Sequence, residues 1–306
     1  MILIIVMLAV LLLVLAATIA LLAHNILSPP RMNDGKAMYV FQRLSPADLN
    51  LQYETMNFRV RDQRSGQPLN IAAWWIPHPA GSDKTVLFIH GYADAKVGSI
   101  AWGPLWQSLG YNVLAIDLRA HGESGGRFTT AGFFERHDID QIINHLRAAH
   151  PRETRKLVLF GISLGAAVAL AAAEIRDDIS ALVLDCPFAS FRSAVGEQMQ
   201  LLKMPLTAML PLTMRFAEFL SGADFDSIQP TELIPRAKCP ILIIQSQDDP
   251  FVPPADAERI QKAISSRTDA SDLWPVEAFH LLALSFDPQA YRQRLEEFLG
   301  KVDAQQ

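Results

Sequence analysis

Hydrophobic and polar residues follow three different patterns along this chain. Residues 2–23 are apolar throughout, with no charge and no proline. From about residue 55 onward, short apolar runs alternate with longer segments in which apolar residues recur at helical spacing. The stretch between these two regions contains several prolines and shows neither period. We therefore predict three parts: a transmembrane anchor over 1–25, a linker over 26–54 and one domain over 55–306.

The N-terminal apolar run is long enough for a transmembrane helix. A helix of about 22 residues covers roughly 33 Å, which exceeds the ~30 Å hydrocarbon core of a bilayer. The alternative is a cleaved signal peptide, but its apolar region is normally shorter and follows basic residues, whereas no Lys or Arg precedes Arg31 here. We expect an uncleaved single-pass anchor. Arg31, Lys36 and Arg43 follow the span, which by the positive-inside rule favours a domain on the cytoplasmic side.

The recurring apolar runs predict the strands of one sheet. Runs that are apolar on both faces suit parallel strands buried between two layers of helices, and the segments between them are long enough for crossover helices. The first two runs, separated by Ser65 and Gly66, have the pattern of a hairpin. The runs cover residues 57–61, 69–76, 85–89, 112–116, 156–160, 181–184, 240–244 and 273–276. We predict an α/β fold with a mostly parallel, eight-stranded sheet and helices on both faces.

One interval interrupts this alternation. Between Pro187 and Cys239 lie about fifty residues, more than one crossover helix needs. Its middle part, 199–220, is rich in Met and Leu. We predict an inserted cap of short helices over about 188–235, covering the C-terminal edge of the sheet. Its methionines suit either ordinary helix packing or an adaptable wall for an acyl chain, because methionine fills irregular apolar space.

Composition excludes several classes of protein. The chain has 306 residues, of which half are apolar and 19% are charged, enough for a large buried core. The formal net charge of −5 argues against a nucleic-acid partner, because nucleic-acid binding needs a basic surface. Two cysteines cannot make a disulfide framework, and no Cys/His cluster has the spacing of a zinc site. We expect no metal and no organic cofactor.

The sequence GISLG at 161–165 is the first candidate for chemistry. This G-x-S-x-G motif follows a predicted strand directly and opens an alanine-rich helix. A sharp turn from strand to helix strains the backbone of the serine, and it requires small residues two positions before and after, which Gly161 and Gly165 provide. Ser163 is therefore the candidate nucleophile. The alternative is a serine that only caps an ordinary crossover helix.

His280 and Asp249 are the candidates for a general base and its supporting acid. His280 lies on a loop after the last predicted strand, and Asp249 follows the strand at 240–244. The order Ser, Asp, His is the one that a hydrolase triad on such a sheet takes along the chain. Asp248 and Asp185, each placed at the end of a predicted strand, are the alternatives for the acid.

From about residue 55 onward the chain resembles the α/β-hydrolase superfamily. The resemblance is carried by the segments LNIAAWWIP, LFIHGYADAK, AIDLRAHGESGG, GISLG, PILIIQSQDDPFVP and AFH. Within the superfamily the chain is similar to the membrane-anchored serine hydrolases of the ABHD13/ABHD17 (BEM46-like) type and their bacterial relatives. In that family Val-Pro follows the acid after two residues, a spacing to Val252-Pro253 that Asp249 has and Asp248 lacks. The relatives usually carry His-Gly where this chain has Gln245-Ser246.

The resemblance also implies an oxyanion hole. The backbone N–H groups of Leu164 and Tyr92 would bind the oxygen of a tetrahedral intermediate, and Gly91 would let the Tyr92 loop approach closely. We expect His90 to brace that loop by hydrogen bonds. Arg119 is expected to tie its own loop to the sheet, with a contact to substrate as the alternative.

These features predict a serine hydrolase of the carboxylesterase, thioesterase or lipase kind (EC 3.1). It would cleave ester or thioester bonds through an acyl-enzyme, and the anchor and apolar cap favour lipid-like acyl substrates. A serine peptidase or amidase is the enzymatic alternative, and a catalytically silent, membrane-tethered scaffold is the alternative from another class. The expected partners are a small or lipid-like ester and a membrane.

Overall fold

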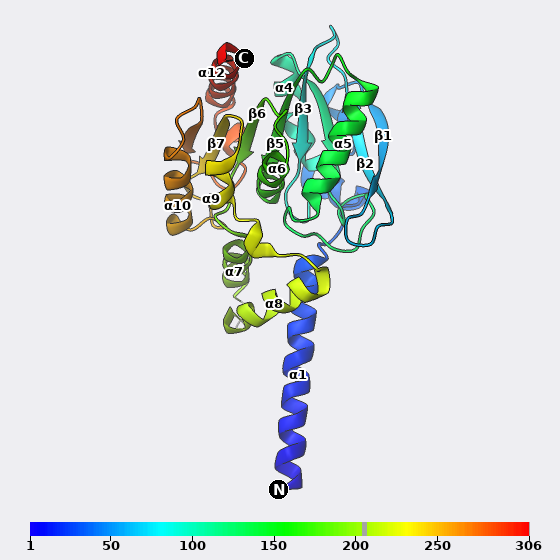
Figure 1. Ribbon diagram of the computed structural model, residues 1–306, viewed down its shortest axis with the longest axis vertical. Helices are drawn as coiled ribbons and strands as arrows, with labels where there is room; N and C mark the ends of the chain where they lie inside the picture. Colours follow the sequence, from blue (N-terminus) through cyan, green and yellow to red (C-terminus); the bar gives the residue numbers. More distant parts are fainter. Residues whose placement is uncertain (204–206, 306) are drawn as a thin grey trace.

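The computed structural model describes residues 1–203 and 207–305. Residues 204–206, which belong to the predicted cap, and residue 306 lie outside the described part. Figure 1 shows a layered domain from which one long helix, α1 (Ile2–Leu27), projects. That helix contains the predicted anchor and runs two residues beyond it. It is the one helix in the described residues that is long and apolar enough to cross a membrane.

A single eight-stranded sheet forms the middle layer, as predicted. Its strand order is β1-β2-β4-β3-β5-β6-β7-β8, and among these eight strands β2 alone runs opposite to the rest, because it pairs antiparallel with both β1 and β4. Each strand agrees with its predicted apolar run to within three residues at either end. The bounds are β1 Glu54–Arg61, β2 Pro68–Ile76, β3 Lys84–Ile89, β4 Asn112–Ile116, β5 Lys156–Ile162, β6 Ala181–Asp185, β7 Ile241–Ser246 and β8 Asp272–Val276.

Alternate side chains of the central strands enter two separate hydrophobic cores. In β5, Leu157 and Leu159 belong to the core under α5 (Glu135–Ala149) and α6 (Leu164–Glu174). Val158 and Phe160 point to the other side, into the core shared with the C-terminal helix α12 (Pro288–Gln305). Burial on both faces explains why the middle positions of these strands are consecutively apolar. The fold is therefore the predicted α/β-hydrolase arrangement with helices on both faces.

The linker predicted over 26–54 is more structured than expected. It contains the helix α2 (Asp34–Phe41), whose first turn is capped by the Asn33 side chain, and a short 3-10 helix η1 (Pro46–Leu49). Ala37 and Leu51 are buried in the domain. The prolines that suggested an open linker instead stand at helix ends and turns. This segment packs along the domain rather than spacing it from α1.

Short helices make up the predicted cap. Figure 1 shows α7 and α8 beside the point where α1 leaves the domain, whereas α9 lies further up against the body of the domain. The remaining helices connect the strands. The bounds of the cap elements are α7 Phe191–Leu201, η3 Thr207–Met209, α8 Leu210–Ser221, η4 Phe225–Ser227, α9 Pro230–Leu233 and η5 Ile234–Arg236. The connecting helices are α3 Lys96–Ser99, η2 Ile100–Trp102, α4 Gly103–Ser108 and α10 Pro254–Ser265, and α11 Ala283–Phe286 follows the last strand and leads into α12.

The carboxyl ends of the parallel strands meet at one edge of the sheet. The loops that leave β3, β5, β6, β7 and β8 there carry Tyr92, Ser163, Cys186, Asp249 and His280 respectively. This edge faces α7 and α8, so residues from five loops and from the cap converge there. In open α/β sheets such an edge is where ligands bind.

Candidate active site

Ser163 lies at a sharp turn between β5 and α6. Its backbone has φ 52° and ψ −112°, a region that L-residues other than glycine rarely occupy. Its N–H donates to the Asp185 carbonyl at 2.9 Å, which ties the turn to β6. A methyl group at Gly161 would overlap the Gly165 carbonyl, and one at Gly165 would overlap the Ile89 carbonyl. The two motif glycines therefore allow the strand, the helix and β3 to pack this closely.

Asp249 and His280 lie in contact with each other. Their loops follow β7 and β8, which are neighbours in the sheet. The His280 Nδ1–H donates to the Asp249 carboxylate at 2.5 Å, and the second oxygen of that carboxylate accepts from the Phe251 N–H at 2.8 Å. Asp249 is buried, whereas its neighbour Asp248 is exposed. Of the two adjacent aspartates, Asp249 is the one that orients the imidazole.

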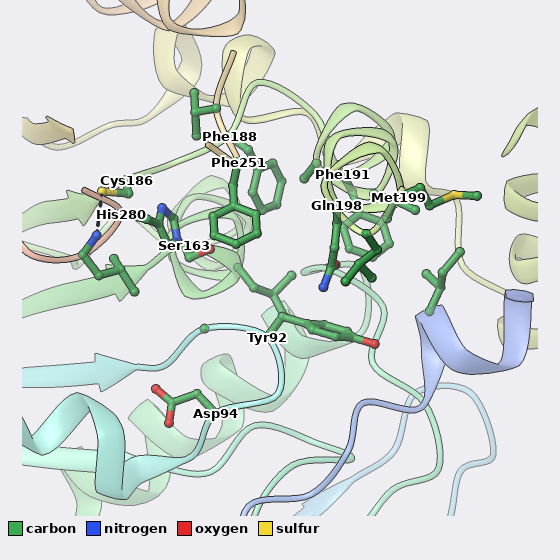
Figure 2. A pocket seen from close by; sticks show the side chains of 18 of the residues that line it. Tyr92, Asp94, Ser163, Cys186, Phe188, Phe191, Gln198, Met199, Phe251 and His280 are labelled. Carbon is green, nitrogen blue, oxygen red and sulfur yellow. Dashed lines mark hydrogen bonds between the residues drawn. The ribbon is translucent and has the colours of Figure 1, made fainter. Parts of the chain in front are cut away.

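Ser163 and His280 line the same cavity. Figure 2 shows the imidazole of His280 beside Ser163, with Phe251 packed against the ring. Within the described part of the chain, the Ser163 hydroxyl makes no hydrogen bond. Catalytic hydrogen bonds are often long in a ligand-free enzyme and shorten when substrate binds. The structure thus brings the three candidate side chains to one place, with the Asp249–His280 half of the arrangement already formed.

The expected oxyanion donors are at the same cavity. Tyr92 and Leu164 both line it, and neither backbone N–H donates to a backbone carbonyl of the described residues. The expectation about Gly91 is not supported in the same way. A methyl group at Gly91 would make ordinary contacts of 3.5 Å with Ser163 and the Ile162 carbonyl. Close backbone approach therefore does not demand glycine at Gly91, although a side chain there would point at the nucleophile.

The loop before Tyr92 is braced as predicted. His90 Nδ1–H donates to the Gly91 carbonyl at 2.7 Å, and Nε2 accepts from the Leu118 N–H at 2.9 Å. Burial lowers the pKa of His90 well below its usual value, so the ring is neutral and can both donate and accept. Arg119 is held by Asp138 at 2.7 Å and by Asp62 at 3.0 Å. The Arg119 guanidinium thus holds its own loop through these two ion pairs. Arg119 does not line the cavity at Ser163.

Asp185, one alternative for the acid, faces away from His280. Its carboxylate accepts from the Tyr291 hydroxyl at 2.7 Å and from the Cys186 thiol at 3.3 Å. Complete burial raises the pKa of Asp185 to about 6. The Tyr291 hydroxyl accepts in turn from the Trp102 indole at 3.0 Å. Asp185 therefore anchors a buried polar chain that supports the ends of β6 and α12.

The cavity has a volume of about 520 Å³ and is mostly apolar. Its walls come from the strand-end loops, from α7 and from the last turns of α1. The cap contributes Phe191, Val195, Gln198, Met199 and Leu202, and α1 contributes Leu22, Asn25 and Ile26. Sequence reasoning missed the α1 wall, because nothing in a uniformly apolar run distinguishes the residues that will face a cavity. It also missed Asp94, the one carboxylate among the described residues that line the cavity.

Cys186 is a further lining residue that the motifs did not indicate. Its backbone, like that of Ser163 and Leu281, has a positive φ, and all three residues line the cavity. Ligand atoms of Cys186, Asp249 and His280 lie within 4.8 Å of one another, a spacing that could hold a metal ion. Burial raises the pKa of the Cys186 thiol well above its usual value. In this cluster the His280 Nδ1–H and the Asp249 carboxylate already bond each other at 2.5 Å.

Comparisons with known proteins agree with this architecture. A family model described as serine aminopeptidase, S33 (Hydrolase_4) matches residues 80–231. Protein YqkD of Bacillus subtilis is 28% identical over 230 residues, covering 74% of each chain. Protein bem46 of Schizosaccharomyces pombe is 26% identical over 212 residues, or 69% of this chain and 65% of that one. The solved structure of the Pyrococcus furiosus esterase Pf2001 has a TM-score of 0.72 at 26% identity, covering 90% of this chain and 98% of its own.

Proposed function

The chain belongs to the α/β hydrolases and matches BEM46-like members of that family, and from this premise we propose that it is a serine hydrolase of carboxylic esters or thioesters. The observation that carries the proposal is the hydrogen bond from His280 to buried Asp249 beside the strained Ser163 turn. The similar esterase of known structure supports the same class of reaction.

The proposed reaction runs in two halves. His280 takes the proton of the Ser163 hydroxyl as its oxygen attacks the acyl carbon, and Asp249 stabilises the imidazolium. The carbonyl oxygen becomes negative and is bound by the N–H groups of Tyr92 and Leu164. His280 then gives the proton to the departing alcohol or thiol. His280 then takes a proton from water as the water oxygen attacks the acyl carbon, and it gives that proton to the Ser163 oxygen as the Ser163–acyl bond breaks and the carboxylic acid leaves.

The shape and polarity of the cavity favour an ester with an apolar acyl group. Its walls beyond the loops are mostly apolar side chains of α7 and α1, with Gln198 and Asn25 as the polar residues among them. A peptidase that recognises a free amino terminus would need a fixed negative charge in its cavity. Asp94 is the candidate for that charge, because it is the carboxylate among the described lining residues. Burial raises the pKa of Asp94 to about 7, so much of it is neutral at physiological pH. The description of the matching family model as an aminopeptidase keeps an amidase as the second candidate.

A fluorophosphonate probe tests the nucleophile. The probe is expected to form an adduct on Ser163, located by peptide mass spectrometry, and the Ser163→Ala variant should form none. Ser193→Ala on the cap is the matched control and should be labelled like the wild type. Absence of an adduct in protein with a cooperative thermal transition would instead support the silent scaffold.

The substrate class is tested with acyl p-nitrophenyl esters, acyl thioesters and the matching anilides. We expect turnover of esters and thioesters at rates at least a hundredfold above those of the anilides. Anilide cleavage with negligible turnover of every ester would support the amidase.

We also propose that α1 anchors the chain in a membrane as a single pass, with the domain on the cytoplasmic side. The support is the length and apolarity of α1 and the position of Arg31, Lys36 and Arg43 after it.

A further inference from the structure

The last turns of α1 are part of the substrate cavity. Leu22, Asn25 and Ile26 line it together with Ser163 and His280. The Tyr92 hydroxyl donates to the Asn25 carbonyl at 2.7 Å, so the loop that carries a proposed oxyanion donor is bonded directly to the helix. Burial raises the pKa of Tyr92 to about 12, which keeps this hydroxyl a neutral donor. A helix that has the composition of a membrane span thus also forms one wall of the candidate active site.

The freely exposed part of α1 is too short to span a bilayer. Residues 2–17 are exposed, and residues 18–27 are mostly covered by the domain. Sixteen helical residues cover roughly 24 Å, whereas the hydrocarbon core measures about 30 Å. A transmembrane span of about 20 residues that begins at Ile2 therefore ends near Leu21. The next residue, Leu22, already lines the cavity. If α1 crosses the membrane, the hydrocarbon reaches the base of the domain.

The cap helix at that level presents apolar side chains outward. Thr213, Met214 and Ala217 of α8 are buried toward the domain and α1. On the opposite face Leu212 is 58% exposed and Phe219 is 79% exposed. Two large apolar side chains on the outward face of a helix that packs beside a candidate membrane span suit a helix that lies in a lipid interface.

The neighbouring charges suit the same surface. Arg215 is exposed between Leu212 and Phe219 on α8, and Lys203 is exposed after α7. Long basic side chains beside apolar ones can reach phosphate headgroups while the apolar groups insert below them. Figure 1 shows α7 and α8 next to α1 at the end of the domain from which it projects. Because α8 packs against α1 at this end of the domain, a bilayer that holds α1 would lie next to the exposed face of α8.

We propose that α8 lies in the surface of this bilayer and that the cavity opens into the lipid along α1. The substrate would be an amphiphilic ester whose acyl chain enters from the membrane, past Leu202, Leu22 and Ile26, with its carbonyl reaching Ser163. Gln198, an exposed polar side chain that lines the mouth, would lie near the headgroup side. This inference rests on the proposed hydrolase function for its substrate and on the α8 surface for its membrane contact.

The membrane contact is tested by fluorescence of the full-length protein in lipid nanodiscs. Phe219→Cys on α8 and Lys301→Cys on α12, at the opposite end of the domain, are each labelled with an environment-sensitive NBD dye. The native Cys186 and Cys239 are buried and should react slowly. The dye at position 219 is expected to emit at shorter wavelength and to resist iodide quenching at least threefold better than the dye at 301. Equal quenching at the two positions would show that α8 stands in water and would overturn the proposal.

The proposed route of the acyl chain through the cavity is tested with a variant that narrows the cavity. Ile26→Trp places a large ring on the cavity wall, whereas Leu21→Trp makes the same change at a position that is 60% exposed and does not line the cavity. The measured quantity is the ratio of kcat/KM for a dodecanoyl ester to that for a butanoyl ester, in nanodiscs. We expect Ile26→Trp to lower this ratio at least tenfold and Leu21→Trp to leave it within twofold of the wild type. A wild-type ratio in both variants would overturn the acyl path.

The two tests also separate this inference from the function it rests on. A wild-type protein that turns over neither ester and takes no fluorophosphonate at Ser163 contradicts the hydrolase and, with it, the substrate named here. The fluorescence comparison still decides whether α8 lies in the bilayer, because it needs no catalysis.

Discussion

At the scale of single residues, the candidate site depends on side chains fixed by their neighbours. One Asp249 carboxylate oxygen accepts from the Phe251 N–H and the other accepts from His280. These two hydrogen bonds fix the orientation of both the carboxylate and the imidazole ring. Ser163 is held in a strained conformation by the hydrogen bond from its N–H to Asp185. Strained backbone of this kind persists only where the surroundings fix it, and it gathers at functional sites.

The adjacent aspartates give a matched test of the proposed acid. Asp249→Asn should lower kcat by roughly 10⁴-fold, because an amide no longer selects the required imidazole tautomer or stabilises the imidazolium. Asp248→Asn changes an exposed carboxylate one residue away and should stay within about threefold of the wild type. Steady-state ester hydrolysis measures both. A comparable loss in the two variants, or none in Asp249→Asn, would falsify the assignment of Asp249.

Asp185 predicts a pH dependence of stability. Its pKa is raised from 3.8 to about 6 in the folded protein, so the folded state keeps its proton over a range in which the unfolded state has lost it. The contribution of Asp185 to the free energy of unfolding should therefore fall by about 3 kcal/mol as pH rises from below 4 to above 6. The Asp185→Asn variant lacks this titrating group. Its free energy of unfolding should therefore rise relative to that of the wild type as pH increases from about 4 to about 6.

Urea unfolding of the detergent-solubilised chain at pH 4.5 and 7.5 measures this effect. Asp177→Asn, at an exposed carboxyl, is the control and should follow the wild-type pH profile. A profile for Asp185→Asn that runs parallel to the wild type would contradict the prediction.

At the scale of elements, the strands and the turn after β5 were predictable from sequence. Leu157 and Val158 belong to different cores, so consecutive positions of β5 after Lys156 had to be apolar, and a run of this kind is visible without coordinates. The glycine spacing around Ser163 reflects a steric requirement that is equally local. The order of the triad candidates along the chain followed from where strands end.

Other elements depend on contacts that the sequence does not reveal. Leu21 and Leu22 are adjacent leucines in one apolar run, yet one is exposed and the other lines the cavity. The linker helix α2 has the capping residue Asn33, but its packing against the domain depends on the tertiary placement of Ala37. Gly91 shows the converse error, since a family motif suggested a close approach that the geometry does not require.

Two glycines inside or beside helices should respond to alanine in opposite directions. Gly165→Ala would push a methyl group into the Ile89 carbonyl and should destabilise the fold by about 3 kcal/mol or more. Gly300→Ala in α12 meets no atom within 4 Å and should stabilise the helix by up to about 1 kcal/mol. Chemical denaturation measures both. If Gly165→Ala is as stable as the wild type, β3 and α6 are not packed as described.

At the scale of the whole molecule, the domain and α1 form one unit. The Arg31 guanidinium donates to the carbonyls of Gly122 at 2.9 Å, Ser124 at 2.5 Å and Gly126 at 3.0 Å. The Leu27 carbonyl, at the end of α1, accepts from the Thr129 N–H at 2.8 Å. These hydrogen bonds join the end of α1, and the residues just after it, to the loop that follows β4. They lie at the point where α1 meets the domain.

The proposed anchor predicts the cellular fraction. The full-length chain, expressed in a bacterial host, should remain in the membrane pellet after washing with alkaline carbonate and should enter solution only with detergent. A variant with Leu8, Leu12 and Leu15 changed to Lys places three charges in the span and should lose this behaviour, because each costs roughly 2.5–3.5 kcal/mol at the centre of a bilayer. Recovery of the wild type in the carbonate supernatant would count against the anchor.

If α1 crosses a bilayer as proposed, the bonds of Arg31 and Leu27 also affect how the protein meets its substrate. A domain on a flexible linker could change its orientation freely, but a domain bonded to the end of its own transmembrane helix keeps one orientation toward the bilayer. Its encounters then become a search in two dimensions. Turnover should consequently follow the mole fraction of substrate in the membrane rather than its concentration in the bulk solution.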